Sequence, residues 1–149
     1  MAILYLSYNN LEEFPATWAL RNMVKLGLLD LANNNIKKVH PFTKKVMLSS
    51  LYLNNNQIEE IPVDLCGFSE NTESLNFSYN KLKKIPNIFD ASSVHVMGSV
   101  DFSNNEISGV DDAGGYKGIN ASTVSLANNK FSKFPSELIA AGRHAAALP

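Results

Sequence analysis

Residues 48–61 read LSSLYLNNNQIEEI, and the spacing of the apolar residues in this stretch decides the fold. Leu51 and Leu53 alternate with Tyr52, which is the period of a short strand with one buried face. Asn56 follows three residues after Leu53, and two isoleucines continue the apolar series beyond it. The stretch therefore predicts a strand, then a turn that holds an asparagine, then a returning segment whose apolar side chains join the same core.

The same frame recurs six times along the 149 residues, and an asparagine marks each copy. Successive asparagines lie 25, 22, 24, 25 and 24 residues apart, and in chain order they are Asn9, Asn34, Asn56, Asn80, Asn105 and Asn129. A unit of this length cannot bury its own apolar face alone, whereas stacked units bury it against one another. The repeat therefore predicts a single solenoid.

The frame resembles the LxxLxLxxNxL signature of the leucine-rich-repeat family, and the resemblance covers all six copies. It implies an α/β fold, a right-handed solenoid whose curved parallel sheet of about six strands lines the concave face. Short helical or irregular segments are expected on the convex face. We expect residues 1–142 to form one uncapped leucine-rich-repeat domain that belongs to a longer protein, and residues 143–149 to be a tail, either a fraying helix or of cloning origin.

Proline follows the last apolar residue of the frame in four repeats. Because proline lacks an N–H donor, it ends the strand and suits entry into the convex segment. An apolar residue three positions further on is then expected to pack back into the core. These four residues are Trp18, Leu65, Phe89 and Leu138.

The six asparagines are expected to form a structural ladder. A buried turn leaves backbone donors and acceptors without hydrogen-bond partners, and each such group costs about 1–3 kcal/mol. An asparagine side chain can satisfy both kinds of group. Stacked copies can therefore join one turn to the next along the whole solenoid. This role nearly excludes a ligand-binding role for the same residues.

Paired charges alternate in sign between the last two apolar positions of the frame. The pairs are Glu12-Glu13, Lys37-Lys38, Glu59-Glu60 and Lys83-Lys84, followed by Ser108-Gly109 and Ser132-Lys133. Stacking brings each acidic pair beside a basic pair, and each exposed contact is worth about 0–1 kcal/mol. We interpret the series as a charge ladder that fixes the register of the repeats, and only secondarily as a ligand surface.

The variable strand positions of the concave face are the candidates for partner binding. They are rich in tyrosine, asparagine and serine, a composition that suits a protein or glycan partner. An alternative stays open, in which the small polar residues are merely compatible with a crowded parallel sheet; the tyrosines favour binding because exposed aromatics lower solubility. The candidates are Tyr5, Tyr8, Asp30, Tyr52, Asn54, Asn76, Tyr79 and Asp101.

No sequence motif indicates catalysis, a metal site or a cofactor, so we expect a protein that is not an enzyme. Asp111 and Asp112 lack the spacing of a cation loop, and we interpret them as part of a solvated insertion. Cys66, the single cysteine, reads as a small buried hydrophobe. With 13 basic and 14 acidic residues and no apolar stretch of 18, the chain is expected neither to bind nucleic acid nor to insert into a membrane.

Three functional hypotheses follow. The first is a non-enzymatic interaction module that binds a protein or glycan through the concave face. The second is a repeat segment of a bacterial effector whose enzymatic domain is missing here, although the spacing of 22 to 25 residues argues against that group, whose repeats are regular and about 20 residues long. The third is a self-associating unit that forms a homo-oligomer through uncapped ends, where eight apolar residues would face solvent: Leu4, Leu6, Leu11, Phe14, Val124, Leu126, Phe131 and Phe134.

The irregular repeat lengths and the asparagine-rich turns resemble leucine-rich-repeat proteins of gut bacteria that are expected to be exported. This resemblance implies a bacterial protein that is secreted or attached to the cell surface. One cysteine allows no internal disulfide, and no cysteine-clustered caps flank the repeats, which favours a bacterial or intracellular origin. Because the first expected strand begins two residues after Met1, we expect no signal peptide within this chain.

Overall fold

The computed structural model describes most of the repeat region. The described residues are 2–15, 25–42, 48–62, 65, 72–89, 96–112 and 115–140. Trp18, Cys66, the tail at 143–149 and two of the three histidines lie outside them.

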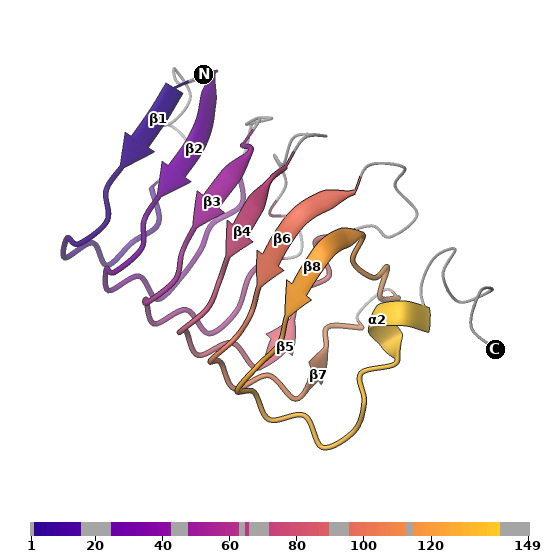
Figure 1. Cartoon of the computed structure of the whole chain (residues 1–149). Helices are drawn as coiled ribbons and strands as arrows, with labels where there is room; N and C mark the ends of the chain where they lie inside the picture. Colours follow the sequence, from indigo (N-terminus) through magenta and orange to yellow (C-terminus); the bar gives the residue numbers. More distant parts are fainter. Residues whose placement is uncertain are drawn as a thin grey trace.

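Six parallel strands form one sheet in the order β1-β2-β3-β4-β6-β8, so sequence neighbours are also spatial neighbours (Figure 1). This confirms the predicted solenoid sheet. The strands are β1 (Ala2–Tyr5), β2 (Leu26–Asp30), β3 (Ser50–Tyr52), β4 (Ser74–Asn76), β6 (Met97–Asp101) and β8 (Ala121–Ser125).

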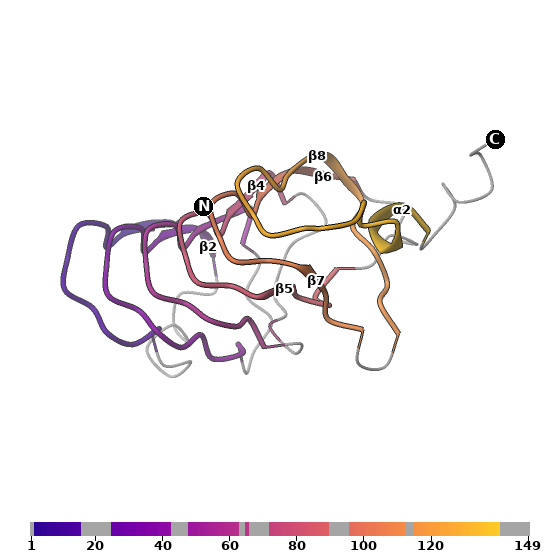
Figure 2. The same cartoon turned by 90° about the horizontal axis from the view of Figure 1, so that it is seen from below.

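A second, smaller sheet lies on the opposite side of the solenoid (Figure 2). It pairs β5 (Lys84–Ile85) with β7 (Gly109–Val110), again in parallel. The one helix within the described residues is α2 (Glu137–Ala140), which has four residues. The convex side of the described part is therefore mainly irregular.

The core is a continuous stack of apolar side chains between the two sides of the solenoid. Leu51 and Leu53 are fully buried, as the strand period predicts. Phe77 and Phe102, from successive repeats, stack with their ring centroids 5.3 Å apart. Leu65 and Phe89, two of the residues expected to pack inward after a proline, are buried, and Leu138 is partly buried against the core.

The first repeat differs from the expectation for an exposed end. Phe14 was expected to face solvent, but it is 2% exposed and its ring meets that of Phe42 edge-on at 5.5 Å. That expectation was wrong because Phe42 comes from the convex segment of the second repeat, which the apolar frame does not describe. At the other end, Phe134 is 74% exposed.

The other six apolar residues at the two ends have exposures between those of Phe14 and Phe134. All six side chains are partly buried, and none is fully exposed. They are Leu4, Leu6, Leu11, Val124, Leu126 and Phe131.

The asparagine side chains join consecutive turns. Asn56 donates from Nδ2 to the carbonyl oxygens of Leu53 (3.1 Å) in its own repeat and Leu31 (3.0 Å) in the preceding repeat. Its Oδ1 accepts from the backbone N–H of Ile36 at 3.0 Å. The same arrangement recurs at Asn34, Asn80, Asn105 and Asn129. Asn9, in the first repeat, is exposed, and among the described residues its side chain bonds only to carbonyls of its own turn.

Candidate functional site: the concave sheet face

The strand register aligns the central candidate residues in one column across the concave face. Cα pairing runs from each repeat to the next without a slip in this column. Its members are Tyr5, Asp30, Tyr52, Asn76, Asp101 and Ser125. The structure therefore brings five of the eight predicted residues into a single row.

Tyr5 and Tyr52 flank Asp30 in this row. Adjacent strands lie about 4.8 Å apart, which places the backbones of the two tyrosines about 10 Å from each other. Tyr5 is 66% exposed, whereas Tyr52 is half-buried between its neighbours. The first three repeats thus present two aromatic side chains with a carboxylate between them.

Three polar residues of the same row have a backbone role that the sequence pattern did not predict. The Oδ1 atoms of Asp30, Asn76 and Asp101 accept from the backbone N–H two residues further on, at 3.0, 3.0 and 2.8 Å. Such local bonds are typical of aspartate and asparagine at turns. Each of these side chains therefore closes the end of its strand, which leaves only part of it available to a partner.

The residue just before each ladder asparagine adopts a left-handed backbone conformation. Its φ lies between 54° and 57° in every repeat, and the six residues are Tyr8, Asn33, Asn55, Tyr79, Asn104 and Asn128. Asparagine tolerates this region because its short polar side chain can bond locally, whereas a bulky side chain there is an outlier. Four repeats follow this preference and two depart from it.

The two departures are the tyrosines predicted to bind a partner. Their backbone N–H groups donate to the next repeat in the same way as those of the asparagines, Tyr8 to Ala32 (3.1 Å) and Tyr79 to Ser103 (3.0 Å). Tyr8 is 81% exposed and Tyr79 is 56% exposed, so burial does not offset the conformational cost. Sequence alone could have shown this signal, since tyrosine replaces asparagine in a column that otherwise contains only asparagine.

Asn54, the remaining candidate, lies two residues before Asn56 in the same turn. It is half-buried, and its carbonyl accepts from the backbone N–H of Asn33 at 3.0 Å. Its side chain makes no hydrogen bond within the described residues. Asn54 therefore lies on the concave face with its backbone bonded and its side chain free of hydrogen bonds to the described residues.

The insertion after the fifth repeat is less solvated than expected. Tyr116 and Ile119 pack against the core, and Asn87 holds the segment by donating to the carbonyl of Gly115 (2.9 Å) and accepting from the N–H of Lys117 (3.0 Å). Within the described residues the Tyr116 hydroxyl has no hydrogen-bond partner, and burial raises the pKa of this phenol. The insertion is thus anchored structure, away from the concave face.

The described residues contain no group of three or more histidine, cysteine, aspartate or glutamate side chains placed to hold a metal ion. In the same part of the chain, no helix has the length and apolar character needed to cross a membrane. The chemistry of the concave face is accordingly that of tyrosine, asparagine, serine and a few carboxylates.

Comparison with known proteins identifies the repeat. Residues 47–68 and 71–91 match the family described as Leucine Rich Repeat. A leucine-rich repeat protein from Bacteroides eggerthii aligns with 93% of the chain at 47% identity and a TM-score of 0.81. The chain is a leucine-rich-repeat protein.

Two further proteins are similar to this chain, at different levels of sequence identity. A leucine-rich repeat protein from Bacteroides thetaiotaomicron is 54% identical over 91% of the chain, with a TM-score of 0.79. Lumican from Bos taurus is 32% identical, and the match covers 59% of the chain. The chain spans 24% and 17% of the two Bacteroides chains and 33% of lumican.

Proposed function

We propose that this leucine-rich-repeat chain is a non-enzymatic interaction module that binds a protein or glycan through its concave sheet face. The observation that carries the proposal is the left-handed conformation of Tyr8 and Tyr79. A left-handed residue other than glycine or asparagine costs about 1–2 kcal/mol. Strain of this kind, held on an exposed surface, is a reason to suspect a function for the residue.

The surroundings of these tyrosines support the same proposal. Tyr8 lies three residues from Tyr5, and Tyr52 lies two strands away in the same column as Tyr5. Tyrosine provides a large contact area with few rotatable bonds, and it is enriched at the residues that dominate binding energy. We infer that Tyr5, Tyr8 and Tyr52 form the main contact area, with Tyr79 as a separate contact further along the solenoid.

The binding experiment starts from the intact chain on printed arrays of glycans and of proteins. Affinity for the strongest reproducible ligand is then measured by calorimetry for the wild type and for a variant with Tyr5, Tyr8, Tyr52 and Tyr79 changed to alanine. Loss of one dominant contact costs about 2 kcal/mol, so we expect the affinity to fall about 30-fold or more.

A matched control is Tyr116→Phe, which changes a tyrosine remote from the concave face. We expect this control to bind like the wild type. Unchanged affinity in the four-tyrosine variant would contradict the proposed face, and the absence of any ligand on both arrays would contradict the proposed classes of partner.

Self-association remains a second candidate because Phe134 is 74% exposed at the end of the sixth repeat. In this hypothesis the apolar ends of two solenoids stack, as successive repeats do within one chain. The change Phe134→Ser should then lower the mass measured by light scattering at high protein concentration. An unchanged mass would count against end-to-end stacking.

We further propose that the protein is bacterial and is secreted or attached to the cell surface. The two Bacteroides relatives support a bacterial source, and the concave face, which carries few charges, suits an external partner. Fractionation of cells that express the full open reading frame, with protease accessibility as the readout, tests the location. Recovery of all the protein from the protease-protected cytoplasm would contradict it.

A further inference from the structure

The paired charges form an exposed stripe on the convex side of the solenoid. The charged stripe consists of Glu12, Glu13, Lys37, Lys38, Glu59, Glu60, Lys83 and Lys84, all of them exposed. Successive pairs are in register. Glu13 and Lys38 are partners in a parallel bridge, and just before the later pairs the backbone N–H groups of Gln57 and Lys81 donate to the carbonyls of Ile36 and Ile58 in the preceding repeat, each at 2.9 Å. The sign of the charge therefore alternates along the stacking direction.

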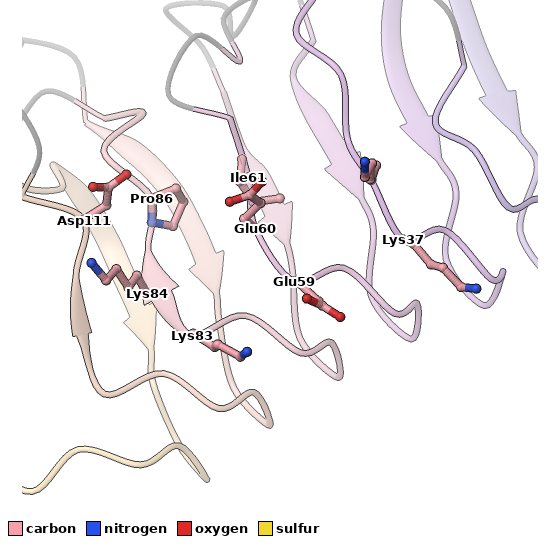
Figure 3. A pocket seen from close by; sticks show the side chains of 9 residues that line it. Lys37, Glu59, Glu60, Ile61, Lys83, Lys84, Pro86 and Asp111 are labelled. Atoms are coloured by element: carbon pink, nitrogen blue, oxygen red, sulfur yellow. The ribbon is translucent and has the colours of Figure 1, made fainter.

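Part of the stripe lines a groove of about 700 Å³. Ile61, Pro86 and Asp111 complete its lining. Lys37, Glu59 and Lys83 come from three successive repeats and extend toward the same side of the ribbon (Figure 3). The groove is thus lined by side chains of alternating charge, whose aliphatic parts together with Ile61 and Pro86 give it an apolar share as large as its polar share.

In the described part of the chain, the stripe side chains do not pair directly with one another. Across the described ranges, none of the eight stripe side chains has an ion-pair or hydrogen-bond partner. The internal charge ladder expected from the sequence has its positions in register but lacks the contacts. Each carboxylate and each ammonium group therefore remains available to a partner.

The order of the charges is complementary to its own reverse. From the first repeat to the fourth it reads minus, plus, minus, plus, and in the opposite direction it reads plus, minus, plus, minus. A twofold axis perpendicular to the stacking direction, between the second and third pairs, would place Lys37 and Lys38 opposite Glu59 and Glu60 of a second copy. The first and fourth pairs would face each other in the same way.

Other arrangements of two copies lack this match. A twofold axis along the stacking direction places like charges against each other. The fifth and sixth repeats, with Ser108-Gly109 and Ser132-Lys133, do not continue the alternation, so the matched stripe has four pairs and a defined centre. Twofold dimers use one self-complementary patch on each subunit, which is what the stripe provides.

We propose that the charged stripe is a docking surface for a second copy of this chain, in an antiparallel dimer held by the twofold arrangement. This inference does not depend on the concave face. The stripe crosses four repeats and is about 15 Å long. The area that it can bury is therefore smaller than the roughly 1,200–2,000 Å² of a typical stable interface. The dimer is therefore weak and its association depends on ionic strength.

Analytical ultracentrifugation of the whole 149-residue chain tests this dimer directly. Between about 0.1 M and about 1 M salt the screening length falls from about 10 Å to about 3 Å. We expect the wild type to approach the mass of two chains with rising concentration at low salt. We expect its association constant to fall about tenfold or more at high salt.

Two charge-reversed variants test the symmetry. Glu59→Lys with Glu60→Lys makes the order minus, plus, plus, plus, whereas Lys37→Glu with Lys38→Glu makes it minus, minus, minus, plus. Each variant alone faces like charges at the centre and should be monomeric. Mixed together, the two are complementary at all four positions, so the mixture should form a heterodimer.

A matched control is Lys117→Glu with Lys130→Glu, which changes the net charge as the lysine-pair variant does but lies outside the stripe. It should dimerise like the wild type, and circular dichroism checks that every variant is folded. A wild type that stays monomeric at low salt, or a mixture that stays monomeric, overturns the proposal. Self-association that survives both high salt and the single reversals also overturns it, and would indicate the apolar ends instead.

Discussion

The change Asn56→Ala gives a sharp test of the asparagine ladder. Asn56 donates to the carbonyls of Leu31 and Leu53, but each of these oxygens also accepts from another ladder asparagine, Asn34 or Asn80. The buried N–H of Ile36 is different, since the Oδ1 of Asn56 at 3.0 Å is its partner. The substitution therefore leaves one buried donor unsatisfied.

The expected loss of stability follows from these hydrogen bonds. An unsatisfied buried donor costs about 1–3 kcal/mol, and the lost donations to carbonyls add about 1 kcal/mol. We expect the free energy of unfolding, measured by urea denaturation, to fall by about 2–4 kcal/mol. Asn54→Ala, in the same turn, removes no side-chain hydrogen bond within the described residues and should cost less than about 0.5 kcal/mol.

A second control lies in the first repeat, where Asn9 is exposed and its side chain accepts no bond from a neighbouring turn. We expect Asn9→Ala to cost less than about 1 kcal/mol. Equal losses for Asn56→Ala and either control would refute the reasoning, because the difference rests on the N–H of Ile36.

Three further predictions concern stability. Gly98→Ala should lower the free energy of unfolding in urea by about 2 kcal/mol or more. The Cβ of the new alanine would lie 3.0 Å from the carbonyl carbon of Glu73 and closer still to the carbonyl oxygen. An unchanged free energy of unfolding would show that this backbone can move apart. Asp101→Ala should cost about 1 kcal/mol by loss of the bond to the N–H of Ser103, whereas Asp101→Asn should be nearly neutral; equal losses would remove the assigned role. Burial raises the pKa of Tyr116 above 10.0, so above about pH 10 the unfolded chain loses a proton that the folded chain keeps. The free energy of unfolding therefore falls as pH rises in this range. Tyr116→Phe should reduce the slope of unfolding free energy against pH, and an unchanged slope would contradict the assignment.

The periodic part of the molecule could be predicted from the sequence because the alternation of apolar residues fixes which side chains face inward. The column that joins Tyr5, Asp30 and Tyr52 was predictable for the same reason, since a repeat in phase leaves one register. These features depend only on spacing.

Features that depend on backbone dihedrals or on the convex segments could not be predicted in this way. The left-handed conformation of Tyr8 and Tyr79 has no apolar signature, and the strand-closing bond of Asp101 depends on a local turn. The burial of Phe14 depends on Phe42, which lies in a segment without a repeat pattern. The spacing of apolar residues in the repeat carries no information about any of these positions.

The central claim is that Tyr8 and Tyr79 are held against the backbone preference of their positions. The most direct measurement is the free energy of unfolding of the double variant Tyr8→Asn with Tyr79→Asn, because asparagine already occupies the equivalent place in the other four repeats. Relief of strain at two exposed residues predicts a gain of about 1 kcal/mol at each position. A double variant that is as stable as the wild type or less stable would contradict the claim.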